Sequence, residues 1–452
     1  MKPNPSIFRE YDIRGIVETD LTSEVAYHLG RAIAAQLREQ NKQTVTVGRD
    51  CRPSGQWLGD ALISGLLASG INTLDVGVVT TPLQYYSIRH FHAEGGVQIT
   101  GSHNPPEYNG FKISLGDETI YGSQIQALGE RMHSERYVNG EGAIRHVDAL
   151  RPYTSEMLEN VRLGKRKLKV VVDAGNGTAG PIAPEIYRAL GCDVVELFCT
   201  MDASFPNHHP DPTVEENLRD LQRAVKQHQA DLGIAFDGDA DRLGVIDDRG
   251  HILWGDQLLI LFARAVLRDV PKATIIGEVK CSKTLFDDIS AHGGRPIMWK
   301  AGHSLIKAKM KETHAQLAGE MSGHIFFKHR YYGFDDGIYA GARLLEILSQ
   351  QEKPLSALLA DIPKTYATPE IRVDCDESQK FALVSKAQEH FRKTHDVVTV
   401  DGVRILFNDG WGLIRASNTQ PILVLRFEAT SQARLREIQQ YVESELSALR
   451  KT

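Results

Sequence analysis

Three similar cycles of short apolar runs and helix-length segments make up most of the chain, and this repetition limits the folds open to it. The first cycle has apolar runs at 44–47, 73–77 and 96–99, with a helical segment at 24–40 before them. The second has runs at 169–175, 193–197 and 231–236, and the third at 273–277, 296–299 and 317–318. Strands that alternate with helices are typical of α/β domains. A pattern repeated in this way predicts three similar α/β domains of roughly a hundred residues each.

Each cycle delivers one polar loop at the end of an apolar run. The loops are Thr-Gly-Ser-His-Asn-Pro at 100–105, Asp-Gly-Asp-Ala-Asp-Arg at 237–242 and Gly-Glu-Met-Ser-Gly-His at 319–324. Ligands of α/β sheets bind at the carboxyl ends of the strands. We therefore expect the three loops to converge on one central cleft. A fourth charged loop, at 48–55, follows the first strand.

After Lys364 the pattern changes to that of an α+β domain. A strand at 371–375 and a helix at 378–394 precede strands at 404–407, 412–415 and 423–429, and a helix closes the chain near residue 450. Successive strands of this kind predict an antiparallel sheet. We expect mixed sheets in the first three domains and place the four domains at 1–148, 149–250, 251–363 and 364–452.

Composition sets the class of protein. The 452 residues are 42% hydrophobic and 24% charged, which suits globular material of three or four domains. A net charge of −6 argues against nucleic acid as a partner. We expect no membrane contact, because no apolar run approaches the roughly 18 residues of a bilayer span and the first residues lack the apolar core of a signal peptide. The five cysteines are scattered without a C-x-x-C pair, so we expect a reducing, cytoplasmic setting and no zinc site.

Asp237, Asp239 and Asp241 stand at every second position of a glycine-containing loop. Three carboxylates so close together repel one another unless a hard cation joins them. An EF-hand needs glycine at the sixth position of its loop, where this chain has Arg242. The alternative is a solvated acidic turn. We expect a divalent metal, and Mg²⁺ in particular, because an oxygen-only site suits a partner that carries phosphate.

Ser102 lies in the first polar loop, where we expect its side chain to be exposed and reachable. The loop is not the G-x-S-x-G turn of hydrolases, so attack on a carbonyl is disfavoured. A serine that carries a phosphoryl group needs a divalent cation and cationic side chains around the oxygens. The alternative is a polar loop in which Ser102 caps the next segment.

Two further turns carry groups suited to a phosphorylated sugar. Glu320, Ser322 and His324 combine a carboxylate acceptor with a hydroxyl donor, as vicinal sugar hydroxyls require, although a plain surface turn is the alternative. The segment 415–420 offers a guanidinium, hydroxyls and backbone donors, which hold a phosphate without a P-loop; its alternative is a hairpin turn. The charged opening at 8–15 reads by itself as a solvated strand.

One motif points to another class of protein. Gly175-Asn176-Gly177-Thr178-Ala179-Gly180 follows a strand, precedes a helix and has Glu196 twenty-one residues after Gly175, which fits the dinucleotide fingerprint formally. Asp173 would then sit close to the pyrophosphate, which argues against an NAD-dependent oxidoreductase. That activity stays the alternative from another class.

Taken together, the motifs resemble the α-D-phosphohexomutase superfamily, and within it the bacterial phosphomannomutase/phosphoglucomutase enzymes. The motifs are FREYDIRG at 8–15, TGSHNPPEYNGFK at 100–112, DGDADR at 237–242, GEMSGH at 319–324 and RASNTQP at 415–421. They follow one another over nearly the whole chain. The methionine of GEMSGH is more like the hexose-phosphate mutases than the phosphoglucosamine mutases, whose motif looks more like GEQSGH; phosphoglucosamine mutase remains an alternative.

The resemblance implies a role for each motif. Ser102 would be the phosphoserine, and Asp237, Asp239 and Asp241 would hold Mg²⁺ together with a phosphoserine oxygen. Glu320 and Ser322 would bind sugar hydroxyls. The non-reacting phosphate would be bound by Arg415, Ser417, Asn418 and Thr419. The positions around the reacting oxygens and the sugar are Tyr11, Arg14, Lys112, Arg242, Lys280, His303 and His324, of which Arg14, Lys112 and His324 would handle protons or stabilise charge.

The resemblance also implies a reaction of carbohydrate metabolism. The phosphoserine would give its phosphoryl group to O1 or O6 of a hexose monophosphate of mannose or glucose, with Mg²⁺ and basic residues stabilising the charge. The hexose 1,6-bisphosphate would turn end for end and return its other phosphate to Ser102. A separable fourth domain would close and reopen around it. We expect sugar phosphates as the partners and a monomer or weak homodimer; a non-catalytic sugar-phosphate sensor is a further alternative.

Overall fold

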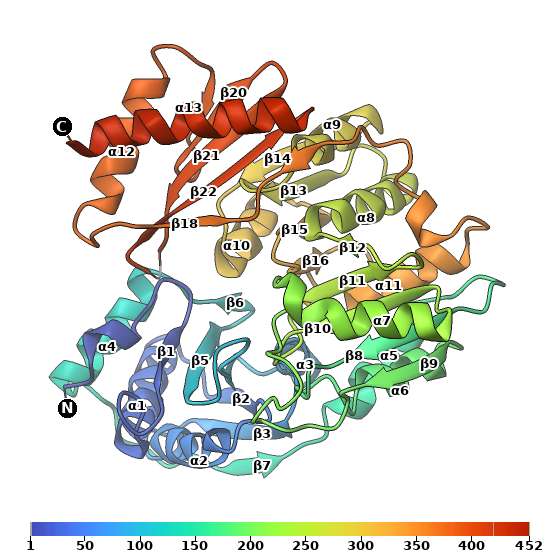
Figure 1. The fold of residues 1–452 in the computed structure, drawn as a ribbon. Helices are drawn as coiled ribbons and strands as arrows, with labels where there is room; N and C mark the ends of the chain where they lie inside the picture. Colours follow the sequence, from blue (N-terminus) through green and yellow to red (C-terminus); the bar gives the residue numbers. More distant parts are fainter. Residues whose placement is uncertain (1, 419, 452) are drawn as a thin grey trace.

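A computed structural model describes residues 2–418 and 420–451 (Figure 1). The N-terminal unit holds a seven-stranded mixed sheet in the order β1-β5-β4-β2-β3-β7, with β6 beside β5. Its strands are β1 (Ile13–Ile16), β2 (Thr44–Arg49), β3 (Asn72–Val78), β4 (Gly95–Ile99), β5 (Tyr108–Leu115), β6 (Glu118–Thr119) and β7 (Ile144–His146). Its helices are α1 (Ser23–Glu39), α2 (Ser54–Leu67), α3 (Thr81–His90) and α4 (Ser123–Ser134). Apolar residues of α1, α2 and α4 share one core with the sheet.

The second and third units are built around smaller mixed sheets. The second contains α5 (Leu150–Asn160), β8 (Lys169–Asp173), α6 (Ala183–Ala189), β9 (Asp193–Leu197), α7 (Arg219–His228), β10 (Leu232–Phe236), β11 (Leu243–Asp247) and β12 (Ile252–Leu253). The third contains α8 (Gly255–Asp269), β13 (Thr274–Glu278), α9 (Lys283–Ala291), β14 (Arg295–Trp299), α10 (His303–Thr313), β15 (Leu317–Gly319), β16 (Ile325–Phe327) and α11 (Gly337–Ser349).

The three sheets share one central order. It reads β5-β4-β2-β3 in the first, β11-β10-β8-β9 in the second and β16-β15-β13-β14 in the third. In each sheet the last three of these strands are parallel and the first is antiparallel to its neighbour. The expectation of three similar α/β units with mixed sheets is therefore confirmed.

This shared order places the polar loops. Residues 100–107, 237–242 and 320–324 each join a parallel strand to the antiparallel strand paired with it, namely β4 to β5, β10 to β11 and β15 to β16. The same corner of each sheet thus presents a polar loop at the carboxyl end of a parallel strand.

The C-terminal unit is an antiparallel sheet with two long helices, as expected. Its strands run in the order β17-β22-β21-β20-β19, with β18 beside β22. They are β17 (Tyr366–Ala367), β18 (Ile371–Asp374), β19 (Val397–Val398), β20 (Val403–Phe407), β21 (Gly410–Ala416) and β22 (Ile422–Ala429). The helices α12 (Lys380–Phe391) and α13 (Gln432–Lys451) pack on the sheet over a core of their own.

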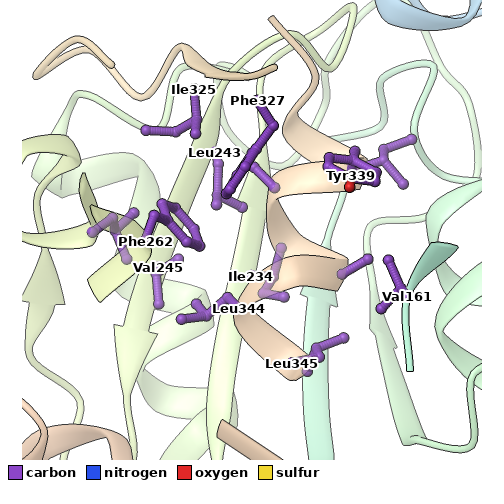
Figure 2. Close-up of a cluster of buried hydrophobic side chains, with 14 of the residues drawn as sticks. Val161, Ile234, Leu243, Val245, Phe262, Ile325, Phe327, Tyr339, Leu344 and Leu345 are labelled. Carbon is purple, nitrogen blue, oxygen red and sulfur yellow. The ribbon is translucent and has the colours of Figure 1, made fainter. Parts of the chain in front are cut away.

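The helix α11 joins the second and third units. All of its residues are buried, and its side chains Tyr339, Leu344 and Leu345 lie between strand residues of both sheets, such as Ile234 and Phe327 (Figure 2). A helix that is buried all round is a core element, and the charged side chains of Arg343 and Glu346 in α11 pair with each other at 3.1 Å. These two units therefore share one hydrophobic core, whereas the C-terminal unit keeps a separate one.

The four units follow one another around the molecule, so that the N-terminal unit and the C-terminal unit are neighbours (Figure 1). Within the described residues, no helix combines the length and the apolar content that crossing a bilayer takes. The domain boundaries after 148, 250 and 363 stay predictions.

Candidate active site

Ser102 lies against the aspartate loop of the next unit. Its Oγ donates a hydrogen bond of 2.9 Å to Asp237 Oδ2 and lies 3.1 Å from His103 Nδ1. The residue has a positive φ of 49°, which is uncommon outside glycine. Our expectation of an exposed serine is wrong: the residue is 3% exposed because the loops of two units close over it. A Cβ on Gly238 would meet the Ser102 carbonyl oxygen at 2.4 Å, so only glycine permits this approach.

The three aspartates form a compact buried group. One carboxylate oxygen from each of Asp237, Asp239 and Asp241 lies within 4.8 Å of the others. Lys112 on β5 donates to Asp239 Oδ2 at 2.8 Å and to Asp241 Oδ2 at 2.5 Å. The solvated acidic turn is therefore not what forms here.

The donor set fits a hard cation. Asp239 Oδ1 is buried and accepts no hydrogen bond from any residue that the structure describes. Burial and the neighbouring charges of Asp241 and Asp239 raise the pKa of Asp237 well above its ordinary range. Burial also opposes ionisation of Asp239 and Asp241, but the Lys112 ammonium, together with Thr81 at Asp239 and with His324 and Arg242 at Asp241, lowers the pKa of both. A divalent cation among these oxygens would relieve the repulsion that remains at Asp237.

Two arginines flank the serine. Arg14 on β1 donates to Asn104 Oδ1 at 2.7 Å and pairs with Asp12 at 2.5 Å. The backbone N–H of Arg242 donates to Asp237 Oδ1 at 3.1 Å, and its Nε lies 3.3 Å from His324 Nε2. The Arg14 guanidinium thus contacts the loop that carries Ser102, and the Arg242 guanidinium lies 3.9 Å from Asp237, the hydrogen-bond partner of Ser102.

His324 links the aspartate loop, residues 237–242, to its own loop, residues 320–324. Its Nε2 lies 3.2 Å from Asp241 Oδ1, and its Nδ1 lies 2.7 Å from Glu320 Oε2. Burial alone would lower the pKa of His324, but Asp241 and Glu320 outweigh it and raise the pKa to about 9. Ser322 Oγ is 3.2 Å from the same Nδ1, and the His303 ring stands 5.8 Å from the His324 ring. The glutamate–histidine loop is therefore no plain surface turn.

The C-terminal turn reaches the same region. Asn418 Nδ2 donates to Tyr11 Oη at 2.6 Å, and Tyr11 Oη donates to the carbonyl of Ala301 at 2.9 Å. Arg415 is held by Asp401 at 3.1 Å, and Ser417 Oγ accepts from the N–H of Gln420 at 3.2 Å. Thr419, also predicted for this turn, lies outside the described residues.

Lys280 follows β13 in the third unit and faces the C-terminal unit. Its Nζ pairs with Glu370 at 2.6 Å and with Glu278 at 3.8 Å, while Glu278 Oε1 accepts from the N–H of Met321 in the loop 320–324. The predicted residues that the structure describes thus form one network of contacts from Ser102 to Asn418. What each of them does in a reaction stays a prediction.

Several buried polar residues of the network were missed by our sequence-based prediction. Thr81 Oγ1 donates to Asp239 at 2.5 Å, and Asp335 accepts from Lys307 at 3.1 Å behind His303. Asp50 and Arg52 contact the serine loop. The one sequence signal for some of them is their position, since Thr81 and the loop 48–55 also follow parallel strands.

The glycine motif at 175–180 packs against other loops. Gly175 N–H donates to Asp173, whose carboxylate pairs with His208 at 3.0 Å. A Cβ on Gly177 would lie 2.8 Å from the Gly238 carbonyl oxygen, next to the aspartate loop. The glycines therefore serve close packing between loops rather than the approach of a pyrophosphate.

Three α/β units of one sheet order and a fourth antiparallel unit, with polar loops that meet at a serine and three aspartates, define an α-D-phosphohexomutase. Family models described as phosphoglucomutase/phosphomannomutase match all four units: alpha/beta/alpha domains I, II and III at residues 5–138, 151–250 and 254–366, and the C-terminal domain at 370–445. The chain therefore belongs to the phosphoglucomutase/phosphomannomutase family. Like that family, it is an enzyme of the isomerase class.

Individual relatives agree over the full length. A phosphomannomutase/phosphoglucomutase of Pseudomonas aeruginosa is 50% identical over 445 residues, which cover 98% of this chain and 96% of that protein. A phosphoglucomutase of Neisseria gonorrhoeae is 48% identical over 438 residues, covering 96% and 95%. The crystal structure of a phosphoglucomutase/phosphomannomutase family protein from Burkholderia thailandensis matches with a TM-score of 0.93 and 46% identity, over 99% of this chain and 98% of that one. The oxidoreductase and phosphoglucosamine alternatives are not favoured.

Proposed function

We propose that this enzyme moves a phosphoryl group reversibly between O1 and O6 of mannose and glucose phosphates through a phosphoserine at position 102. The observation that supports this most directly is the 2.9 Å hydrogen bond from Ser102 to one of three clustered aspartates, with Lys112 bound to the other two. A nucleophile, a cation site and fixed positive charges are the parts that phosphoryl transfer requires.

The residues around Ser102 have distinct proposed roles. Asp237, Asp239 and Asp241, with a phosphoserine oxygen, would hold Mg²⁺, which the family uses. Bound there, Mg²⁺ would neutralise charge on the transferring phosphoryl group. Arg14 and Lys112 would stabilise the equatorial oxygens, because both carry fixed positive charge beside the serine loop or the aspartates. His324, whose pKa of about 9 keeps it protonated at neutral pH, would add positive charge next to the sugar.

In the first half-reaction the P–O bond at Ser102 breaks and a P–O bond to the sugar hydroxyl forms, while the hydroxyl proton passes to a basic group of the site and Ser102 Oγ takes up a proton. The hexose 1,6-bisphosphate then turns so that its other phosphate faces Ser102, and the second half-reaction runs in reverse. Glu320 and Ser322 would bind sugar hydroxyls in both orientations, with Tyr11, Arg242, Lys280 and His303 around them. The distal phosphate would be bound by Arg415, Ser417, Asn418 and Thr419.

The wider setting is also proposed. In the described part of the chain all five cysteines are free thiols, which supports a reducing, cytoplasmic compartment. A monomer or weak homodimer remains our expectation.

The test is turnover by Ser102→Ala. We expect this variant to lose nearly all mutase activity on mannose 1-phosphate and glucose 1-phosphate with Mg²⁺ and a trace of hexose bisphosphate. Binding of the sugar phosphate should survive, because the groups proposed to hold the sugar are untouched. Normal turnover by the variant would remove Ser102 from the mechanism. Faster turnover of glucosamine 1-phosphate by the wild type would instead favour a phosphoglucosamine mutase, and binding without turnover a sensor.

A further inference from the structure

The Arg52 side chain binds the backbone of the loop 100–107, which carries Ser102 and is called the serine loop here. The side chain, 1% exposed, comes from the loop after β2 and donates to four carbonyl oxygens of the segment 102–108. The acceptors are Ser102 and Tyr108, both at 3.0 Å, and Asn104 and Pro105, both at 2.6 Å. A buried carbonyl needs a donor, and a guanidinium supplies several in one plane.

Asp50 holds the other side of the same loop. Its Oδ2 accepts from Thr100 Oγ1 at 2.8 Å and from the N–H of Gly101 at 3.0 Å. The same oxygen pairs with Arg52 Nε at 3.2 Å, and Oδ1 accepts from the N–H of Arg52 at 3.0 Å. The ion pair therefore binds the chain both before and after Ser102.

The fit between the pair and the loop is close. A Cβ on Gly101 would lie 2.4 Å from Cζ of Arg52, so the guanidinium rests directly on the glycine. The opposite unit adds Phe205, whose ring centroid is 5.3 Å from Cζ. Ser102 itself keeps a left-handed backbone that a serine does not prefer, and this conformation lasts only if the surroundings impose it.

We propose that Asp50 and Arg52 are positioning residues for phosphoryl transfer. They fix the backbone of the serine loop, so that the Ser102 oxygen stays at the aspartate cluster in both the free and the phosphorylated state. This inference rests on the proposed role of Ser102. Because the pair contacts none of the groups proposed for the sugar, its loss slows transfer and leaves sugar-phosphate binding intact.

Arg52→Met tests the proposal. The enzyme is first loaded with hexose 1,6-bisphosphate, and intact-mass measurement gives the fraction phosphorylated at Ser102. It is then mixed with glucose 1-phosphate and quenched at intervals to obtain the rate of transfer to the sugar. We expect a rate about tenfold to a hundredfold below the wild type, the range that a small misplacement of a reacting group produces, with KM for glucose 1-phosphate within about twofold.

Arg49→Met is the matched control. Arg49 is a buried arginine three residues earlier, and its ion pair, at 3.0 Å, runs to Asp75 on β3 instead of the serine loop. Arg49→Met should lower the melting temperature about as much as Arg52→Met does. Its transfer rate should stay near the wild-type value. A merely structural role for Arg52 predicts equal transfer rates in the two variants.

Two further variants keep the test decisive if Arg52→Met does not fold. Gly101→Ala pushes the guanidinium away without removing it, and Asp50→Asn weakens its anchor; both should show the same slow transfer with an unchanged KM. If these variants transfer at the wild-type rate while the wild type is phosphorylated at Ser102, the positioning role is overturned and the proposed function stands. If the wild type takes up no phosphoryl group at Ser102, both proposals fall together.

Discussion

Lys112 donates hydrogen bonds to two of the three clustered carboxylates, and its positive charge offsets part of the repulsion among them. Its charge lowers the pKa of Asp239 and Asp241 in spite of their burial, while Asp237, which bonds to a neutral hydroxyl, has a raised pKa. The divalent cation proposed for these aspartates would share Asp239 and Asp241 with the Lys112 ammonium. Its affinity would therefore depend on the charge of Lys112.

Replacing Lys112 by methionine should tighten Mg²⁺ binding. Removing one unit of positive charge beside the cluster is worth a few kcal/mol at the dielectric of a protein surface, so we expect an affinity at least about tenfold higher. In EDTA the melting temperature of the variant should be below that of the wild type. Adding Mg²⁺ should raise the melting temperature of the variant by more than that of the wild type. Isothermal titration calorimetry and thermal melts measure both effects. Lys311→Met, which removes an exposed lysine paired with Glu118, is the control. An unchanged Mg²⁺ affinity would contradict the coupling.

Glu370 gives a pH dependence through its pair with Lys280. The Lys280 ammonium lowers the pKa of Glu370 from 4.5 to about 2 despite partial burial. A carboxyl group with a lowered folded-state pKa stabilises the fold above its unfolded pKa, and this stabilisation fades as the pH falls from about 4.5 toward 2. With 28% of the side chain exposed, we expect about 1–2 kcal/mol. The urea midpoint of Glu370→Gln should thus lie below that of the wild type at pH 6.5 and approach it at pH 3.5. A constant difference would show that the charge of Glu370 is not the cause.

Among the elements, the strands and the loops that follow them were readable from the sequence because both are local. Apolar runs such as 231–236 and the three aspartates directly after them mark a strand end and a cation site without knowledge of the fold. The partners of Arg52 and Arg404 left no such mark, since each donates to backbone carbonyls far away in the chain. Carbonyls are present in every residue. Long-range contacts of this kind follow only from the packing of whole units.

Hydrogen bonds from arginine side chains to backbone carbonyls join the C-terminal unit to the residues that follow β13. Arg404 Nη1 donates to the carbonyls of Val279 and Cys281 at 2.7 and 2.8 Å, and Arg426 Nη1 donates to that of Lys280 at 2.8 Å. The Arg404 guanidinium also lies 3.7 Å from the ring centroid of Trp411. The C-terminal unit thus binds three successive carbonyls around a residue proposed to contact the substrate.

Arg404→Met should therefore weaken substrate capture through Lys280. We expect kcat/KM to fall about tenfold, because the carbonyls of Val279 and Cys281 on either side of the lysine lose two buried hydrogen bonds, each worth about 1 kcal/mol. In a double-mutant cycle with Lys280→Met, the Arg404 change should cost almost nothing further if it acts through that lysine.

Val442→Ala serves as the control for this cycle, since it removes buried side-chain volume from the core of the same unit, away from residues 279–281. It should lower the melting temperature and leave kcat/KM near the wild-type value in both backgrounds. Additive losses for Arg404 and Lys280 would instead mean that the arginine acts on the whole unit.

At the level of the whole molecule, the four units enclose the site in this structure. Ser102, the three aspartates, Glu320, His324 and Arg415 are buried, whereas Tyr11, Arg242, Ser322 and Asn418 are partly exposed, so we expect the units to separate when a hexose phosphate enters. The sequence predicted which loops meet, and the resemblance implied a fourth domain that closes and reopens, but neither indicated how closely the loops pack together. Closure depends on contacts between the first and last units, which are separated by most of the chain.

Tyr11 is the residue where the closing units touch. Its hydroxyl joins the N-terminal unit to Ala301 in the third unit and to Asn418 in the fourth. Tyr11→Phe removes both hydrogen bonds and keeps the ring beside His303, 6.2 Å away between centroids. Two such bonds are worth about 2 kcal/mol, enough to shift the balance toward open molecules by about tenfold or more.

We therefore expect Tyr11→Phe to show a larger radius of gyration than the wild type in small-angle X-ray scattering, and a KM for glucose 1-phosphate about tenfold higher. Saturating sugar phosphate should bring the radius back, because ligand bound between the units favours the closed form. Tyr137→Phe, which loses a hydrogen bond of 2.9 Å to His28 within the N-terminal unit, should leave both quantities unchanged. If Tyr11→Phe matches the wild type in radius and KM, the hydroxyl of Tyr11 has no part in closure.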